Sequence, residues 1–253
     1  MKTIILCGGF GTRISEYTKT VPKPMIKIGQ KPILMHIIDT FKKYEFNDFY
    51  LTLGYKKKVI YDYFSISSKY KKEQIQYKNR LYMGCFYNKN CRIHLIDTGI
   101  NTMTGGRLKR LSNFIEDNSF FLTYGDGLAN VNLHKLLRYH YRYNKIATVT
   151  AVVPPARFGA MMLNKKNIVS KFSEKNHISD NWINGGYFVF SKKIFKILEN
   201  DSTILEQSPL RDLAKKKQLI AYKHKDFWQC MDTVRDRENL NKLNTFKLKP
   251  WLI

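Results

Sequence analysis

The sequence predicts a three-layer α/β fold of the Rossmann-like type, with a mixed but mostly parallel sheet between helices. Short apolar runs of strand length alternate with stretches of helical period, which is typical of parallel strands joined by right-handed crossovers. A helix between two consecutive strands forms the crossover that lets the strands lie side by side in one sheet. The runs that predict the first strands are residues 4–6, 49–53, 93–96, 120–123 and 146–153.

Helical periodicity is clearest between the first and second runs. In residues 32–44 the apolar side chains of Ile33, Ile37 and Phe41 recur at helical spacing, and residues 133–143 show a similar pattern. The second half of the chain is more mixed, and we expect it to extend the same sheet and to form a pocket for a second substrate. Its predicted strands are 168–172, 186–190 and 219–222, and its predicted helices are 192–198 and 209–217.

Residues 56–92 are rich in Lys and Tyr, are polar, and carry little clear period. Two interpretations fit this composition: an exposed insertion with some helix after Lys56, or an arm that packs on a neighbouring subunit. We favour the arm slightly, because exposed aromatic side chains are typical of protein interfaces.

Length and composition predict one domain across residues 1–253. The chain is 43% hydrophobic and offers no linker-like stretch at which it could be divided. We find no apolar run long enough to span a membrane and no signal peptide, so we expect a cytoplasmic protein without a membrane partner. No C-x-x-C pair occurs, which favours reduced structural thiols over disulfides or a metal cluster at Cys7, Cys85, Cys91 and Cys230.

The formal net charge of +24 raises the question of nucleic-acid binding. The basic residues are spread along the chain and accompany abundant Asn, Ile and Tyr, which favours a solvated basic surface over a nucleic-acid footprint. We therefore expect no nucleic-acid partner. A basic surface would still steer a polyanion such as a nucleoside triphosphate toward its site.

The first strand is followed by a glycine-rich loop that ends in a hydroxyl and a guanidinium, Gly8-Gly9-Phe10-Gly11-Thr12-Arg13. Glycines at the end of a buried strand let backbone N–H groups approach an anion closely. The spacing matches neither the P-loop nor the dinucleotide fingerprint. The loop alone is compatible with a structural turn. Arg13 and Lys23, the latter framed by Pro22 and Pro24, favour phosphate binding.

These residues resemble the motifs of the nucleoside-diphosphate-sugar pyrophosphorylases, the sugar-1-phosphate nucleotidyltransferases. Further motifs follow in the family's order and look like the cytidylyltransferase branch, to which the glucose-1-phosphate cytidylyltransferases belong. The resemblance runs from Met1 to about Trp251, and it implies a nucleotide-binding half at 1–130 and an acceptor-binding half at 131–253. The motifs are Thr104-Gly105-Gly106-Arg107, Thr123-Tyr124-Gly125-Asp126-Gly127, Arg157-Phe158-Gly159, Glu174-Lys175, Trp182-Ile183-Asn184-Gly185-Gly186 and Phe227-Trp228-Gln229-Cys230-Met231-Asp232-Thr233.

The implied reaction joins CTP to a phosphorylated small acceptor and releases pyrophosphate by direct in-line attack at the α-phosphorus. Two polyanions must then meet, and two unit charges about 4 Å apart repel by roughly 4 kcal/mol at an effective dielectric of 20, so cations are required. The resemblance implies that Leu6 and Gly8 to Thr12 bind the nucleotide, that Arg13 holds the leaving pyrophosphate, and that Lys23 reaches the α-phosphate and the attacking oxygen.

The resemblance also implies a Mg²⁺ ion held by Asp126 and Asp232, since carboxylates and phosphate oxygens are its preferred ligands. The residues alone leave alternatives open. Asp126 could be a turn-forming residue at a strand end, and Asp232 could cap a helix over residues 234–243.

Base recognition is assigned by resemblance to Thr102, Gly105, Gly106 and Arg107. Backbone amides, a hydroxyl and a fixed guanidinium could select cytosine through its carbonyl and amino groups. A Gly-Gly turn that caps the following helix through Thr104 is compatible with this role.

Acceptor recognition is assigned by resemblance to Gly159, Glu174, Lys175, Asn184 and Gly185, with Glu174 on sugar hydroxyls and Lys175 on the phosphate. The chain departs from the family in two places. Asn176 stands where the family's Glu-Lys-Pro motif has proline, and residues 205–210 lack the Trp and the second acidic residue that often precede Pro-Leu in the family. Glucose 1-phosphate is the first expected acceptor, for surface-polysaccharide precursor synthesis. Alternatives are a non-sugar phosphate such as L-glutamine phosphate in capsule modification, and a non-catalytic nucleotide-sensing subunit. The resemblance implies a homo-oligomer.

Overall fold

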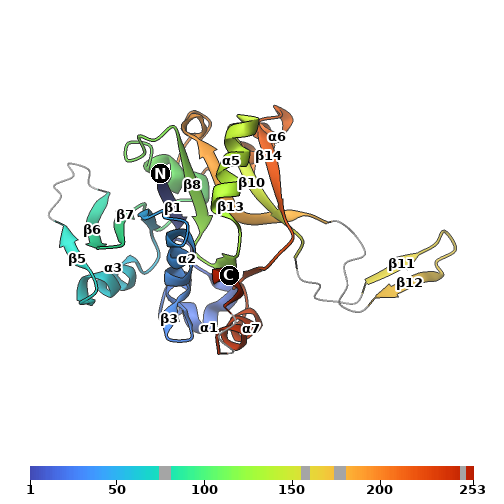
Figure 1. Ribbon diagram of the computed structural model, residues 1–253, viewed down its shortest axis with the longest axis horizontal. Coiled ribbons are helices and arrows are strands. Elements are labelled where there is room, and N and C mark those ends of the chain that lie inside the picture. Colours follow the sequence, from blue (N-terminus) through green and yellow to red (C-terminus); the bar gives the residue numbers. More distant parts are fainter. Residues whose placement is uncertain (74–80, 155–159, 174–180, 246–248) are drawn as a thin grey trace.

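A computed structural model describes residues 1–73, 81–154, 160–173, 181–245 and 249–253. Its centre is a nine-stranded sheet in the order β14-β10-β13-β8-β1-β4-β7-β6-β5 (Figure 1). The strands in chain order are β1 (Lys2–Leu6), β4 (Asp48–Leu53), β5 (Lys71–Glu73), β6 (Tyr82–Asn88), β7 (Cys91–Asp97), β8 (Ser119–Tyr124), β10 (Ala147–Val152), β13 (Ile183–Ser191) and β14 (Leu219–His224).

The sheet is mixed and mainly parallel, as predicted. Strands β8, β1, β4 and β7 pair in parallel, and β10 pairs in parallel with β14. Only β13 and β6 run against their neighbours, because each pairs antiparallel on both sides. The carboxyl ends of the parallel strands therefore share one edge with the first residues of β13. Ligands bind at this edge in open α/β sheets.

Helices cover both faces of the sheet and complete the three layers. The helices are α1 (Ser15–Thr18), α2 (Ile33–Lys42), α3 (Lys57–Ile66), α4 (Thr104–Arg110), α5 (Leu133–Tyr143), α6 (Ser208–Lys215) and α7 (Val234–Thr245). Alternation along β1 sends Ile5 into one buried cluster, with α2, α3, α5 and α7, and sends Ile4 and Leu6 into the other, with α4 and α6. Each face of the sheet thus has its own hydrophobic core.

The described parts of residues 56–92 contain more regular structure than an exposed insertion with some helix after Lys56. Helix α3 does follow Lys56, but the segment also supplies β5 and β6, which extend the sheet beyond β7. Phe64 and Phe86 are fully buried in the core. The sequence does not reveal these buried positions because the apolar residues of this Lys- and Tyr-rich segment recur without a clear period.

Most other predicted elements are confirmed, with small shifts at their ends. Helix α5 has the predicted bounds, and the Asn132 side chain caps it by accepting from the Lys135 N–H. The predicted helix at 192–198 is instead a short 3₁₀ helix, η3 (Lys192–Lys196). The remaining 3₁₀ helices are η1 (Thr12–Ile14), η2 (Lys23–Met25) and η4 (Pro250–Leu252).

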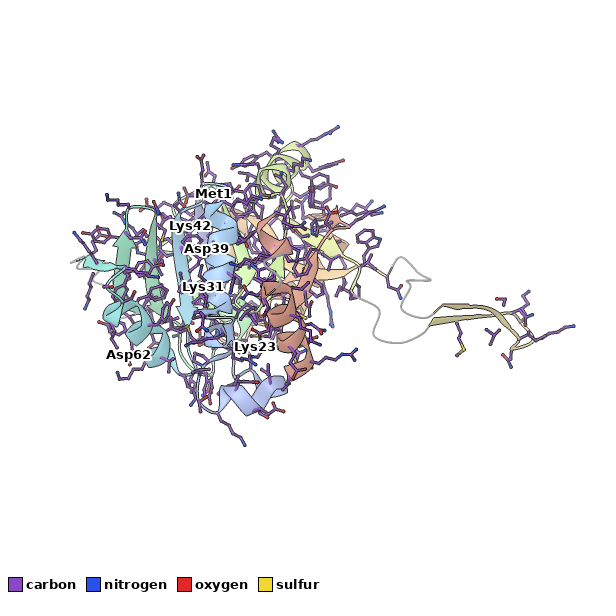
Figure 2. The ribbon with its side chains drawn as sticks, turned by 60° about the horizontal axis from the view of Figure 1, so that its bottom comes forward. Met1, Lys23, Lys31, Asp39, Lys42 and Asp62 are labelled. Carbon is purple, nitrogen blue, oxygen red and sulfur yellow. The ribbon has the colours of Figure 1, made fainter. Side chains whose placement is uncertain are left out.

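Three small sheets complete the fold: β2 (Lys27–Ile28) with β3 (Lys31–Pro32), β9 (Gly127–Ala129) with β15 (Trp228–Cys230), and β11 (Ala160–Leu163) with β12 (Val169–Ser173). The β11–β12 hairpin extends away from the body of the molecule (Figures 1 and 2). It exposes the apolar side chains of Met161, Ile168 and Val169.

Candidate active site

The glycine loop leaves β1 at the ligand-binding edge of the sheet. Between Gly8 and Arg13 the chain turns into η1, with Gly11 in the left-handed conformation at φ 66°. The N–H groups of Gly9, Phe10 and Gly11 donate no hydrogen bond to any described part of the chain. Unpaired amides on a partly exposed loop are available to an anion, which agrees with the predicted phosphate-binding role.

The same loop packs tightly against Lys23. A Cβ on Gly11 would lie 2.8 Å from Thr18 Cγ2 and 3.1 Å from Lys23 Cβ, so only glycine fits. On the other side, a Cβ on Gly125 would lie 2.8 Å from Pro24 Cγ. Lys23 is therefore held between the loop after β1 and the loop after β8. Figure 2 shows Lys23 and Met1 toward opposite ends of the body, as expected for a residue beyond the carboxyl end of β1.

Lys23 joins the two carboxylates that the sequence assigns to a metal. Its Nζ donates to Asp126 Oδ2 at 2.5 Å and to Asp232 Oδ1 at 2.6 Å. Arg13 Nη1 donates to the other oxygen of Asp232 at 2.7 Å. Four predicted catalytic side chains from distant parts of the chain thus form one continuous network of alternating charge.

Burial and charge act in opposite directions on this network. Burial disfavours the Lys23 ammonium, but the adjacent Asp126 and Asp232 carboxylates outweigh it and raise the pKa of Lys23. Burial likewise disfavours the Asp232 carboxylate, but hydrogen bonding and charge from Lys23, with the charge of Arg13, lower the pKa of Asp232. Lys23 and Asp232 are therefore both charged near neutral pH.

The pairing of β9 with β15 brings the two carboxylates together. Gly127 lies opposite Cys230, and the Met231 N–H donates to the Asp126 carbonyl at 2.9 Å. Asp232 is not the cap of α7, because Asp236 Oδ2 accepts from the N–H and the hydroxyl of Thr233, and Thr233 Oγ1 accepts from the Asp236 N–H. The Asp232 side chain is left to face Lys23.

The donor set fits a magnesium ion. Because one nitrogen lies 2.5 Å from an Asp126 oxygen and 2.6 Å from an Asp232 oxygen, those oxygens are at most about 5 Å apart. The described residues contain no cluster of three or more metal-ligating side chains. Two carboxylates without further protein ligands suit Mg²⁺, which is usually bound by one or two carboxylates together with phosphate oxygens and water.

The buried Arg107 guanidinium donates hydrogen bonds to three separate parts of the chain. Arg107 is 4% exposed, and Nη2 donates to the Gly8 carbonyl at 2.9 Å and to the Ile100 carbonyl at 3.2 Å. Nη1 donates to the carbonyls of Leu53 and Gly99 and to Thr98 Oγ1. The guanidinium therefore contacts main-chain oxygens at the end of β4 and in the segments that follow β1 and β7, and it ties these three parts of the chain together.

Gly105 and Gly106 lie within α4 and allow close backbone packing. Their N–H groups donate to the Thr203 carbonyl at 2.9 and 3.1 Å, and a Cβ on Gly106 would lie 2.5 Å from the Asp201 oxygen. Thr104 does not cap α4: its hydroxyl donates to Glu206 Oε2 and accepts from the Leu205 N–H. The alternative of a turn that caps the helix through Thr104 is therefore not observed. Thr102 is buried beside this helix start.

On the acceptor side, Asn184 and Gly185 lie at the beginning of β13, at the same edge as the glycine loop. Asn184 Oδ1 accepts from the Gly186 N–H at 2.8 Å, and the Gly185 carbonyl accepts from Trp228 Nε1 at 2.7 Å. The predicted acceptor residues Gly159, Glu174 and Lys175 lie outside the described residues.

Sequence reasoning missed two side chains at this edge. Tyr124 ends β8 directly before Gly125, and its hydroxyl donates to Glu206. Tyr124 belongs to the motif Thr123-Tyr124-Gly125-Asp126-Gly127, which could have indicated it. No local sequence pattern indicates that Glu206, in the loop before α6, contacts it.

The chain belongs to the nucleotidyl transferase family, whose model matches residues 2–236. It is similar to the glucose-1-phosphate cytidylyltransferase of Salmonella typhimurium (strain LT2), with 40% identity over 254 residues that cover 99% of this chain and 98% of that protein. It is also similar to a probable glucose-1-phosphate cytidylyltransferase of Bacillus subtilis, with 40% identity covering 96% of each chain.

The fold is that of a solved sugar nucleotidyltransferase. A crystal structure of a putative glucose-1-phosphate thymidylyltransferase from Bacillus anthracis superposes with a TM-score of 0.71 at 18% identity, covering 96% of this chain and 94% of that one. Within the described ranges, no helix has the length and apolar character needed to cross a membrane.

Proposed function

We propose that this nucleotidyltransferase is a Mg²⁺-dependent cytidylyltransferase that joins CTP to glucose 1-phosphate and releases pyrophosphate. The observation that carries the proposal is the Lys23–Asp126–Asp232 cluster beside a loop with unpaired amides. It supplies both cations for phosphates and carboxylates for a metal. A nucleotide sensor would not need this combination, and likeness to two cytidylyltransferases over the full chain supports the choice of base.

The proposed chemistry is a single displacement. An acceptor phosphate oxygen forms a bond to the α-phosphorus of CTP while the bond to the bridging oxygen of the β-phosphate breaks. Arg13 and the Gly9–Gly11 amides would hold the leaving pyrophosphate, and Lys23 would neutralise the α-phosphate and the attacking oxygen. Asp126 and Asp232 would hold Mg²⁺, which supplies charge neutralisation to the phosphates when bound. Arg107 would keep the nucleotide loops in place.

Glucose 1-phosphate is proposed as the acceptor because the two similar proteins, which are named as a glucose-1-phosphate cytidylyltransferase and a probable one, align with nearly the whole chain. Within this proposal, residues 1–130 form mainly the nucleotide half and residues 131–253 mainly the acceptor half. Asn184 and Gly185 would contact the sugar together with Gly159, Glu174 and Lys175. The product, a CDP-linked sugar, would serve as a precursor of surface polysaccharide, and we place the reaction in the cytoplasm, where CTP is made.

We also propose that the chain forms a homo-oligomer. The β11–β12 hairpin projects from the body and exposes Met161 by 58% and Ile168 by 59%. Apolar side chains on a projecting hairpin are costly in water unless a partner covers them.

The test is pyrophosphate release from CTP with Mg²⁺ and a panel of phosphorylated acceptors. We expect fast release with glucose 1-phosphate and slow release when UTP or dTTP replaces CTP. Trace rates with every sugar phosphate and fast turnover with a phosphorylated amino acid would overturn the acceptor. Tight CTP binding without turnover of any acceptor would favour the sensor instead.

A further inference from the structure

Glu206 links three elements at the ligand-binding edge. Its Oε2 accepts from Thr104 Oγ1 at 2.7 Å, and its Oε1 accepts from the Tyr124 hydroxyl. The Tyr124 oxygen accepts in turn from Asn184 Nδ2 at 3.4 Å. One carboxylate thus connects the first residue of α4, the last residue of β8 and the second residue of β13.

In the part of the chain that the structure describes, the Glu206 carboxylate accepts hydrogen bonds only from hydroxyl groups. Glu206 is half-buried, and it forms no ion pair among the residues that the structure describes. Hydrogen bonds to a charged acceptor are stronger than neutral ones. Burial and the neighbouring Glu206 charge raise the pKa of Tyr124, so its hydroxyl keeps the proton that it donates.

The far end of the network also contacts the backbone. Asn184 Oδ1 accepts from the Gly186 N–H, and Gly186, at φ 80°, leaves room for Tyr124, whose Cδ2 lies 2.7 Å from the position of a Cβ on Gly186. The orientation of the Asn184 amide therefore depends on two contacts, one from the backbone and one from the Tyr124 oxygen. Of these two contacts, the one with the Tyr124 hydroxyl can be removed by substituting a side chain, whereas the one with the Gly186 N–H is made by the backbone.

We propose that Glu206 is a positioning residue for acceptor recognition: it fixes the Tyr124 hydroxyl and, through it, the exposed amide of Asn184. This inference rests on the proposed function, because it assigns Asn184 to the acceptor. The nucleotide should be affected much less, since the described partners of the Glu206 carboxylate are Thr104, which also binds the Leu205 N–H, and Tyr124, and neither is assigned to the nucleotide.

The test is a double-mutant cycle with E206Q, Y124F and the double variant, in which kcat and both KM values are measured from pyrophosphate release. Each single variant should raise the acceptor KM about tenfold and leave the CTP KM within about twofold of wild type. The double variant should be no worse than the worse single variant, because both changes break the same path. Y124F removes the hydroxyl that joins Glu206 to Asn184, whereas E206Q changes its acceptor, so the test does not depend on one variant alone.

Glu199→Gln is the matched control, because Glu199 is an exposed carboxylate in the loop before α6 whose side chain has no partner among the described residues. It should behave as wild type. Parallel rises in both KM values, or additive effects in the double variant, would indicate a general structural role and overturn the inference alone. A wild-type chain that converts no acceptor would overturn the proposed function and this inference with it.

Discussion

Lys23 Nζ lies 2.5 Å from Asp126 Oδ2, although 103 positions separate the two residues in the sequence. The contact joins a buried lysine to a carboxylate assigned to a metal, and Asp232 occupies the other side of the same nitrogen. Without ligands, the cations and anions of the site neutralise each other. Phosphates and Mg²⁺ would then replace these internal pairs with pairs to substrate.

Replacing Lys23 or Arg13 with Ala should lower turnover by at least about a hundredfold, the scale of losing a charge contact made in the transition state. Pyrophosphate release measures the rate, and thermal unfolding checks that each variant folds. Lys27→Ala, an exposed lysine nearby, is the control and should keep full activity. Near-normal release by either site variant would contradict the phosphate role.

Asp126→Asn and Asp232→Asn should each weaken metal binding as well as rate, because each removes one charged ligand. Binding of Mn²⁺ as a probe, followed by electron paramagnetic resonance in the presence of CTP, measures the first effect independently of turnover. Asp226→Asn changes an exposed carboxylate and should leave binding intact. Unchanged Mn²⁺ affinity in both site variants would exclude a metal shared by these carboxylates.

Glu174→Gln and Lys175→Ala should raise the acceptor KM or abolish its use while leaving CTP binding nearly unchanged. A polar group left without its partner costs about 1 to 3 kcal/mol, so deoxy and epimeric sugar phosphates should fail at the positions Glu174 reads. Calorimetry of CTP binding supplies the second measurement. Lys193→Ala, at an exposed position, serves as the control. A loss of CTP affinity equal to the loss of acceptor affinity would refute the assignment.

Arg107→Lys should weaken CTP and UTP binding by similar factors. Lysine cannot reach the carbonyls of Gly8, Leu53 and Gly99 together, so the loops should loosen for every nucleotide. Gly8→Ala should have a related effect, because its Cβ would lie 2.0 Å from Arg107 Nη1. A selective loss of CTP over UTP would instead indicate that Arg107 contacts the base.

His140 should make stability depend on pH. Burial lowers its pKa to about 4 from an ordinary value of 6.5, so the unfolded chain binds the proton first. Its contribution to the free energy of unfolding is therefore complete above pH 6.5 and is lost as pH falls toward 4. Urea denaturation across this range should show a dependence of the free energy of unfolding on pH that His140→Gln reduces. A variant with the same dependence on pH as the wild type would contradict the prediction.

The sequence indicates the parts of the site better than their partners. Phosphate binding is indicated in the sequence by three glycines, by Arg13 and by Lys23 between two prolines, because each is unusual for its local structure. Nothing local indicates that Lys23 bridges Asp126 and Asp232, since that contact depends on the β9–β15 pairing between distant segments. The same holds for Arg107, whose residue type suggests a ligand but whose burial directs it to carbonyl oxygens.

The fold shows a similar division. Strands buried on both faces, such as β1 and β4, are evident as apolar runs, whereas the edge strand β5 and its neighbour β6 are hidden because they carry a mixed pattern of polar and apolar residues. The 3₁₀ helix η3 was expected to be a longer α-helix because Ile194 and Leu198 have helical spacing. Spacing of apolar residues cannot distinguish a single tight turn from the beginning of a longer helix.

Strand β13 runs against both of its neighbours, so its first residues, Asn184 among them, stand where the other strands finish. The loops after β1, β4 and β8 leave that edge, whereas β13 begins there. A segment that enters a strand at this edge can change in length or sequence without altering the loops that leave the same edge. Under the proposed function, the reversed direction of β13 would let acceptor choice change separately from nucleotide binding, and exchange of the preceding segment between relatives would be a route to new CDP-linked products.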